Sequence, residues 1–139
     1  MRIFKLLVAL PMVLFLQGCP DPTEPDAILV IANNSSGDII YYDQYRLAED
    51  TALVTIARPL NSENTRNFIV QSNSSIERLG AFRGVFDDLP DHLLMVYVFS
   101  RDTIDQVPWE EIVARNLVLR RYELTEGELD SLDWRIEYP

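Results

Sequence analysis

The sequence predicts an α+β, β-rich fold, an antiparallel and sandwich-like arrangement of about six strands with short helices. Three observations support it. Residues 93–99 form an apolar run without alternation, which is typical of a central strand covered on both faces. Residues 134–138 alternate strictly, as a half-buried strand does. Between them, Thr125 and Glu128 have the spacing of a helix capping box.

The first predicted strand is 28–32, a short run rich in β-branched residues. The turn residues 33–37 follow it, and 38–42 favours a return strand, so the three segments predict a hairpin. Residues 43–64 are ambiguous, although 53–56 is compatible with a strand.

Residues 66–71 predict a further strand with Phe68 and Val70 on one face. Residues 74–79 favour the start of a short helix, whose length the glycines at 80 and 84 limit.

After the central strand, Ser100 and Asp102 are candidate helix caps, and Pro108 suits the first position of a second short helix. Residues 117–124 predict a strand. The capped helix then runs to Leu132, with Leu129 and Leu132 facing the core. In the closing strand, Trp134, Ile136 and Tyr138 point inward.

The N-terminal residues predict export. Arg2 and Lys5 precede an uncharged apolar run, 6–16, which is typical of a signal peptide and shorter than the roughly 20 residues of a membrane-spanning helix. The run ends in Leu16-Gln17-Gly18-Cys19, which resembles the lipobox of bacterial lipoproteins. Cys19 is the only cysteine in the chain, which favours lipidation by fatty acyl chains such as palmitate over a disulfide.

Three segments follow from this interpretation. Residues 1–18 are the signal peptide, 19–26 are the lipidated cysteine with a tether rich in proline and acids, and 27–139 are one globular domain. The expected location is the cell envelope, with the outer membrane favoured because Pro20 rather than aspartate follows Cys19.

The charge of the chain excludes one class of partner. The net charge is −10, and loss of Arg2 and Lys5 with the signal peptide makes the remainder more acidic. Nucleic-acid binding needs a basic stripe that neutralises phosphates, and the sequence has none. The membrane, reached through lipid on Cys19, and an unknown protein or glycan are the expected partners.

The last third of the chain resembles a recurrent C-terminal pattern of small lipoproteins from Bacteroidetes. Its residues are Phe99, Asp102-Thr103-Ile104, Trp109-Glu110-Glu111-Ile112, Leu119-Arg120-Arg121-Tyr122-Glu123-Leu124-Thr125, Leu129, Leu132 and Trp134-Arg135-Ile136-Glu137-Tyr138-Pro139. The resemblance implies compartment and lineage, and it carries over no catalytic residue.

No catalytic residue, metal site or cofactor is expected. His92 is the only histidine, and it follows the acidic run 87–91, but one histidine is too few for the usual zinc site. A solvated acidic turn explains that run. The pairs Glu110 with Glu111 and Glu126 with Glu128 resemble the carboxylates of a glycosidase, although acids in a first helical turn also stabilise the helix dipole.

Two further groups of residues have alternative interpretations. Tyr41, Tyr42 and Tyr45 suit either a platform for a sugar ring or a strand that alternates between core and surface. Three short motifs resemble O-glycosylation acceptors of Bacteroidetes, with Thr51, Thr103 and Ser131 as the modified residues. Helix starts and surface positions explain the last two equally well.

The expected function is therefore that of a membrane-anchored envelope lipoprotein with a non-enzymatic binding or structural role. The alternative is a hydrolase acting on glycans or peptides through carboxylates. A cluster of carboxylates around a deep pocket would favour the hydrolase, and a shallow surface would favour the binding role.

Overall fold

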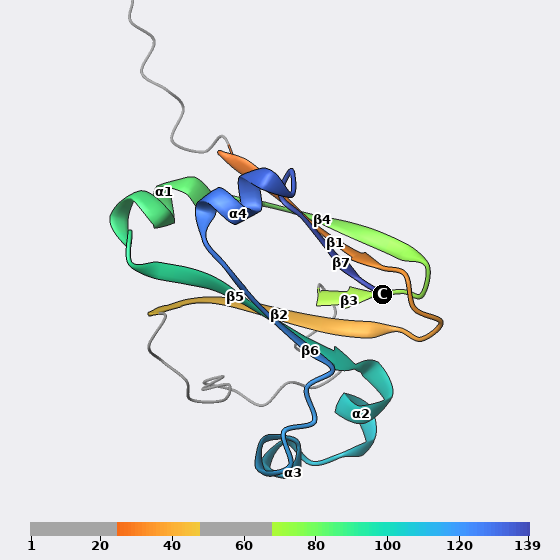
Figure 1. Ribbon diagram of the computed structural model, residues 1–139. Coiled ribbons are helices and arrows are strands. Elements are labelled where there is room, and N and C mark those ends of the chain that lie inside the picture. Colours follow the sequence, from red (N-terminus) through yellow and green to blue (C-terminus); the bar gives the residue numbers. More distant parts are fainter. Residues whose placement is uncertain (1–24, 48–67) are drawn as a thin grey trace, which may run out of the picture.

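The computed structural model describes residues 25–47 and 68–139, which form two β-sheets and short helices at their ends and on one face (Figure 1). In chain order the elements are β1 (Ala27–Asn33), β2 (Ile39–Leu47), β3 (Ile69–Val70), β4 (Ser74–Gly80), α1 (Phe82–Asp88), β5 (His92–Ser100), α2 (Arg101–Gln106), α3 (Trp109–Ala114), β6 (Arg120–Leu124), α4 (Glu126–Ser131) and β7 (Arg135–Tyr138).

The two sheets confirm the predicted class, α+β and β-rich. One sheet has the strand order β4-β1-β7, and the other has the order β3-β2-β5-β6. All neighbours pair antiparallel except β1 and β7, which run parallel with Val30 opposite Arg135. The prediction of an antiparallel arrangement is therefore wrong for this one pair, which brings the C-terminal strand beside the first strand.

The predicted hairpin of the first two strands is wrong in its pairing. Both strands and the turn between them exist, yet β1 belongs to one sheet and β2 to the other. The side chain of Asn33 accepts hydrogen bonds from the amide and hydroxyl of Ser35 and donates to the carbonyl of Gly37. The turn thus carries the chain across the sandwich instead of folding it back within one sheet.

The predicted helix at 74–79 is also wrong, because this segment is strand β4, paired with β1 along its length. Its side chains alternate, with Ile76 and Arg78 half-buried and Glu77 exposed. The helix comes later, at α1, and it includes Gly84. Of the predicted strand at 66–71, the described part, 68–71, contains the two-residue strand β3. Residues 66–67 and the predicted strand at 53–56 lie outside the described residues.

Strand β5 is the centre of the molecule, as its unbroken apolar run predicts. Its side chains alternate between two hydrophobic clusters, one between the sheets and one beneath the helices α2 and α3. Leu94, Val96 and Val98 belong to the first cluster, whereas Met95, Tyr97 and Phe99 belong to the second. Both faces of the strand are therefore buried, which explains the absence of polar alternation.

The helices after β5 confirm the cap predicted at Ser100, whereas Asp102 lies within the first turn of α2. The hydroxyl of Ser100 accepts a hydrogen bond from the amide of Thr103, which begins α2. Pro108 precedes α3 by one residue instead of occupying its first position. The predicted strand at 117–124 is shorter, because β6 begins at Arg120.

The capping box is confirmed in full. Thr125 accepts from the amide of Glu128, and the Glu128 carboxylate accepts from the amide of Thr125. Leu129 is buried as predicted, but Leu132 is 47% exposed, so its predicted burial is wrong. The reason is length, since α4 ends at Ser131 and Leu132 turns outward. Trp134 and Ile136 are buried and Tyr138 is half-buried, which confirms the predicted inward face.

Candidate functional site

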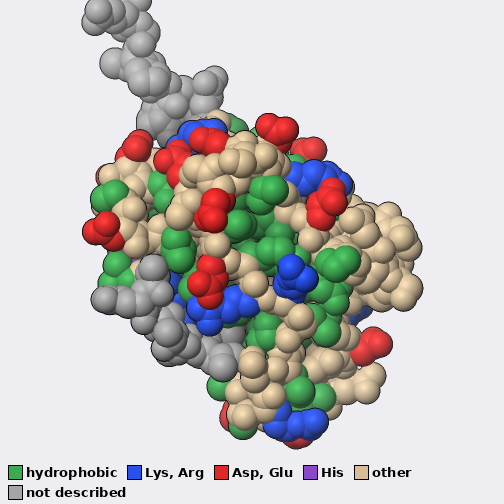
Figure 2. Space-filling model, in the orientation of Figure 1, with side chains coloured by type: hydrophobic (Ala, Val, Ile, Leu, Met, Phe, Trp, Pro, Cys, Tyr) green, Lys and Arg blue, Asp and Glu red, His purple; other side chains and the backbone are tan. Residues whose placement is uncertain are grey.

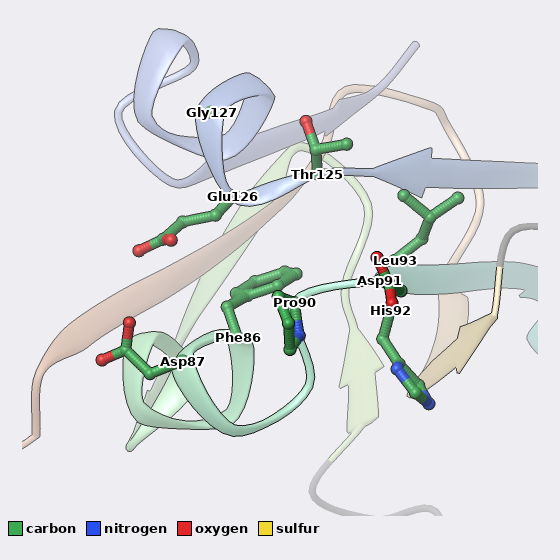
Figure 3. Close-up of a pocket in the computed structure, with 9 residues that line it drawn as sticks. All are labelled: Phe86, Asp87, Pro90, Asp91, His92, Leu93, Thr125, Glu126 and Gly127. Atoms are coloured by element: carbon green, nitrogen blue, oxygen red, sulfur yellow. The ribbon is translucent and has the colours of Figure 1, made fainter.

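One cavity among the described residues lies where α1, the start of β5 and the start of α4 meet. Its volume is about 510 Å³. The lining residues are Phe86, Asp87, Pro90, Asp91, His92, Leu93, Thr125, Glu126 and Gly127 (Figure 3). The cavity therefore combines residues that are more than thirty positions apart in the sequence.

One side of this cavity is formed by the end of α1 and the turn that leads into β5. Pro90 disfavours helical geometry at the residue before it, so α1 ends at Asp88 and Leu89 is its C-terminal cap. The amide of His92 then donates to the carbonyl of Leu89, which turns the chain into β5. Phe86, on the last turn of α1, contributes an apolar surface between the two carboxylate-bearing helices.

The opposite side comes from the capping box. Thr125 ends the extended segment of β6 and begins α4, which places Glu126 and Gly127 at the cavity. Glu128 lies in the same turn, but its carboxylate is occupied by Thr125. These hydrogen bonds hold the pKa of Glu128 below its ordinary value. Of the two glutamates predicted as a carboxylate pair, Glu126 lines the cavity, whereas Glu128 caps the helix.

Glu126 itself is part of an ion-pair network with α1. Arg83 Nη1 lies 3.1 Å from its carboxylate, and Arg83 Nη2 lies 2.6 Å from the carboxylate of Asp130. Trp134 donates from Nε1 to Asp130 at 2.8 Å, and the Arg83 guanidinium lies over the indole ring. The hydrogen bonds from Arg83 and then from Trp134 lower the pKa of Asp130.

The imidazole of His92 is poorly placed for acid–base chemistry in this cavity. Figure 3 shows the Asp87 and Glu126 carboxylates on the same side of the Phe86 ring, whereas the His92 ring is directed away from both. His92 Nδ1 is buried, and no described residue gives it a hydrogen-bond partner. Within the described part of the chain, no group of three histidine, cysteine or acidic side chains is placed to hold a metal ion.

Tyr45 lies close to the cavity and is equally unsuited to act as a base. Its hydroxyl donates to the carbonyl of Phe82, and its ring packs edge-on against Phe86. Burial, with smaller contributions from the charges of Asp26 and Glu126, raises the pKa of Tyr45 to about 12. The phenol therefore stays protonated near neutral pH.

The three tyrosines of β2 do not form a sugar platform. Tyr41 is buried between the sheets and packs edge-on against Phe68. Tyr42 points to the other face and packs against the second cluster, beneath α2 and α3. The structure supports the other interpretation, in which the tyrosines alternate between the two faces of the strand. Both of these faces are largely covered, whereas the sequence predicted one core face and one surface face.

The carboxylates of Glu110 and Glu111 are exposed in the first turn of α3, away from the cavity. Glu111 pairs with Arg115 at 2.6 Å, one turn further along the helix. The helix and its ion pair account for this sequence pair without a role in chemistry.

The candidate modification sites differ in accessibility. Cys19 and Thr51 lie outside the described residues. Thr103 is half-buried in the first turn of α2. Ser131 is exposed at the end of α4, where its hydroxyl donates to the carbonyl of Gly127 at 2.8 Å. Ser131 is therefore the more accessible acceptor of the two described.

Sequence reasoning missed Arg83, Phe86 and Asp26 as residues around the cavity. Asp26, the residue before β1, accepts hydrogen bonds from the backbone of α1. No local pattern announces this contact, because the partners are separated by more than fifty residues. The sequence signals at this end of the molecule are the acidic run at 87–91 and the capping box that begins at Thr125, and neither indicates that the two segments meet.

A smaller cavity of about 390 Å³ lies between the edge strands β6 and β7. It is lined by Tyr122, Leu132, Arg135, Ile136 and Glu137. The hydroxyl of Tyr122 donates to the carbonyl of Glu137 at 2.7 Å and so connects the two edges. Arg135 and Glu137 pair with each other, which leaves the groove without a free charge that would select a ligand.

None of the described helices is both long enough and apolar enough to span a bilayer. Comparisons with protein-family models, with curated proteins and with solved structures gave no match to this chain.

Proposed function

We propose that the protein is a lipid-anchored lipoprotein of the bacterial cell envelope, held at the outer membrane, with a non-enzymatic binding or structural role. One observation carries the anchor. The only cysteine of the chain, Cys19, directly follows an uncharged apolar run with two cations before it. Diacylglycerol transfer requires a thiol at that position, and two or more acyl chains hold a protein stably on a membrane.

The architecture of the body is consistent with attachment through this segment. The chain enters the body at β1, beside α1 and α4, and acidic side chains gather at this end in the face shown in Figure 2. From Cys19 to Asp26 there are seven residue steps, which span at most about 25 Å. Under this proposal the acidic end lies nearest the membrane, where repulsion from anionic headgroups would keep the body off the surface.

Replacing Cys19 with serine tests the anchor. We expect the Cys19→Ser protein to lose labelling by radioactive palmitate and to accumulate as a larger precursor. A second variant that adds Ser36→Cys restores a thiol at an exposed turn and should remain unlabelled, because acyl transfer needs the position and not only the thiol. Normal processing of Cys19→Ser, or lipid on a different residue, would contradict the proposal.

A binding role suits the main cavity better than catalysis does. The cavity joins an apolar surface at Phe86, Pro90 and Leu93 with carboxylates at its rim, a mixture typical of ligand sites. Glu126 is neutralised by Arg83, and the only histidine is directed away from it. We therefore propose that the cavity contacts a protein or glycan partner without transforming it.

The hydrolase remains the second candidate because one observation favours it: Asp87, Asp91 and Glu126 share a single cavity. A panel of glycan and peptide hydrolysis assays on the purified chain distinguishes the two. The binding proposal expects no turnover. Turnover that disappears in Glu126→Gln or Asp87→Asn, while the circular dichroism spectrum stays unchanged, would establish the hydrolase instead.

We further propose that Ser131 is the O-glycosylation acceptor among the described candidates, because it is exposed and Thr103 is half-buried. Intact-mass spectrometry of the processed chain from its native host would show the glycan, and Ser131→Ala should remove it. A glycan that persists in Ser131→Ala and is lost in Thr103→Ala would assign the modification to α2.

A further inference from the structure

Helix α1 is capped by a residue from a distant part of the chain. The two carboxylate oxygens of Asp26 accept hydrogen bonds from the amides of Arg83, at 3.0 Å, and Gly84, at 2.8 Å. The amide of Asp26 donates to the carbonyl of Gly80 at 3.2 Å, which extends the ladder of β1 and β4 by one bond. Asp26 therefore binds the end of the β1–β4 pair through its backbone and the first turn of α1 through its side chain.

The local sequence gives helix α1 no cap of its own. Its own N-terminal cap is Ala81, which has no side-chain acceptor, and its first turn contains no acidic residue. Gly84 lowers the helix propensity further. A helix of seven residues is far below the length that is stable alone in water. The carboxylate of Asp26 thus replaces the cap that the local sequence lacks.

The position of α1 determines the main cavity. Phe82 and Phe86 are buried, and both rings pack against Trp134. Arg83 ties the same helix to Glu126 and Asp130 of α4. Phe86 and Asp87 line the cavity directly. The beginning of α1 is therefore connected to the cavity by the packed aromatic rings and the ion pairs of Arg83.

We propose that Asp26 is a latch that couples the chain segment before β1 to the shape of this cavity. With Asp26 seated, α1 is helical and the cavity has the lining described above. With Asp26 withdrawn, the first turn of α1 opens and Phe82 and Phe86 loosen around Trp134. The latch goes beyond the proposed function and does not depend on the lipid anchor, because every contact in it belongs to residues 26–134.

Hydrogen exchange on the full-length protein in detergent micelles tests the latch. In Asp26→Ala, amides of 82–86 should exchange about five-fold faster than in the wild type, as expected for loss of a helix cap. Asp26→Asn keeps one acceptor oxygen and should give an intermediate rate. Asp102→Ala, which removes the same charge from an exposed position of α2 outside the cavity, should leave the exchange of α1 unchanged.

The location of the effect decides the outcome. Faster exchange in α1 with unchanged exchange in β5 supports a latch. Unchanged exchange in α1, or equal acceleration of α1 and β5, overturns it, since the second result means general destabilisation. If Asp26→Ala does not fold, the same comparison is made with Asp26→Asn.

A fluorescence measurement tests whether loss of the Asp26 cap also loosens the packing around Trp134. The chain has two tryptophans, so Trp109→Phe leaves Trp134 as the only one. In that background, quenching of Trp134 by acrylamide should rise by at least about two-fold with Asp26→Ala, following the same loss of the cap. Unchanged quenching alongside faster exchange in α1 would show that the helix frays without moving the cavity, and would overturn the coupling.

Discussion

Trp134 shows how much of the core rests on one side chain. It is 6% exposed, it contacts Phe82 and Phe86, and its indole N–H is satisfied by Asp130. Its backbone is left-handed, with φ of 56°, a conformation that non-glycine residues seldom adopt. The packing and the hydrogen bond offset this strain, and together they direct the chain from α4 into β7.

Replacing Trp134 with alanine should therefore be costly. We expect Trp134→Ala to lower the free energy of unfolding by about 3–5 kcal/mol, because a large buried side chain is removed and a cavity remains. Trp109, which is half-buried beside Phe99, is the matched control, and Trp109→Ala should cost clearly less. Urea titration followed by circular dichroism measures both. Similar losses for the two variants would contradict the central role of Trp134.

The sequence identifies Trp134 as buried but not its special backbone. Strict alternation with Ile136 and Tyr138 predicts the inward face, and the structure confirms it. The left-handed φ values at Asp133 and Trp134 arise because the chain must leave α4 and enter β7 within three residues. That requirement depends on where β1 lies, so no local pattern contains it.

At the scale of single elements, α4 is predictable because its determinants are local. The threonine and glutamate of its capping box are three residues apart, and the hydrogen bonds join the same two residues. Helix α1 is not predictable for the opposite reason, since its cap is Asp26. Strand β4 is mistaken for a helix because 74–75 resemble a helix cap, although the alternation of the following residues is consistent with a strand.

The cap of α4 also makes a prediction about acid stability. The pKa of Glu128 and that of Asp130 are both lowered by hydrogen bonds in the folded state. A lowered folded pKa contributes stability above the ordinary pKa of the group and loses it as the pH falls through the folded value. The melting temperature of the wild type should therefore drop as the pH falls below about 4.5, the ordinary value for glutamate.

Glu128→Gln isolates part of this effect. The variant should melt below the wild type at pH 7, and the difference between them should shrink as the pH falls toward 3. Glu110→Gln makes the same change in the first turn of α3, where no residue caps the helix through its side chain. Thermal melts of the three proteins from pH 7 to pH 3 provide the measurement. A difference that is independent of pH would show that the carboxylate charge of Glu128 is unimportant.

At the scale of the whole molecule, the two sheets are joined by polar contacts in addition to the hydrophobic core between them. Arg78 of β4 pairs with the nearly buried carboxylate of Asp43 on β2, and Tyr122 of β6 donates to the backbone of β7. Such contacts require strands that are distant in sequence to be in a defined register. The main cavity has the same origin, since it forms only when α1 and α4 meet at one end of the sandwich.

The fold class could be predicted because the hydrophobic pattern of a strand indicates how many of its faces are buried. The apolar run of β5 corresponds to two buried faces, and the alternation in β7 corresponds to one. The order of strands and the parallel pairing of β7 with β1 are not predictable in this way. A turn such as 33–37 has the same composition whether the flanking strands pair with each other or separate into two sheets. Long-range contacts distinguish these outcomes, among them the hydrogen bonds from Asn33 to Val70 and Gln71 and the pairing of β1 with β4 and β7.

Asn33 is the clearest of these links and provides the last prediction. It is fully buried at the end of β1, and its amide donates to the carbonyls of Gly37, Val70 and Gln71 at 2.8–3.1 Å. It therefore fastens the first sheet, the crossing turn and β3 of the second sheet. Because an aspartate of the same shape cannot donate, Asn33→Asp removes this donor from the carbonyls of Val70 and Gln71 and adds a buried charge, whereas the Gly37 carbonyl keeps a hydrogen bond from the hydroxyl of Ser35.

We expect Asn33→Ala to cost about 1–3 kcal/mol of unfolding free energy through the unpaired carbonyls, and Asn33→Asp to cost more. Asn34→Asp makes the same chemical change at the exposed neighbour and should stay within about 0.5 kcal/mol of the wild type. Urea titrations at pH 7 measure all three. If Asn33→Asp were as stable as Asn34→Asp, the donated hydrogen bonds would not hold the sheets together, and the crossing of the chain would have to rest on hydrophobic packing alone.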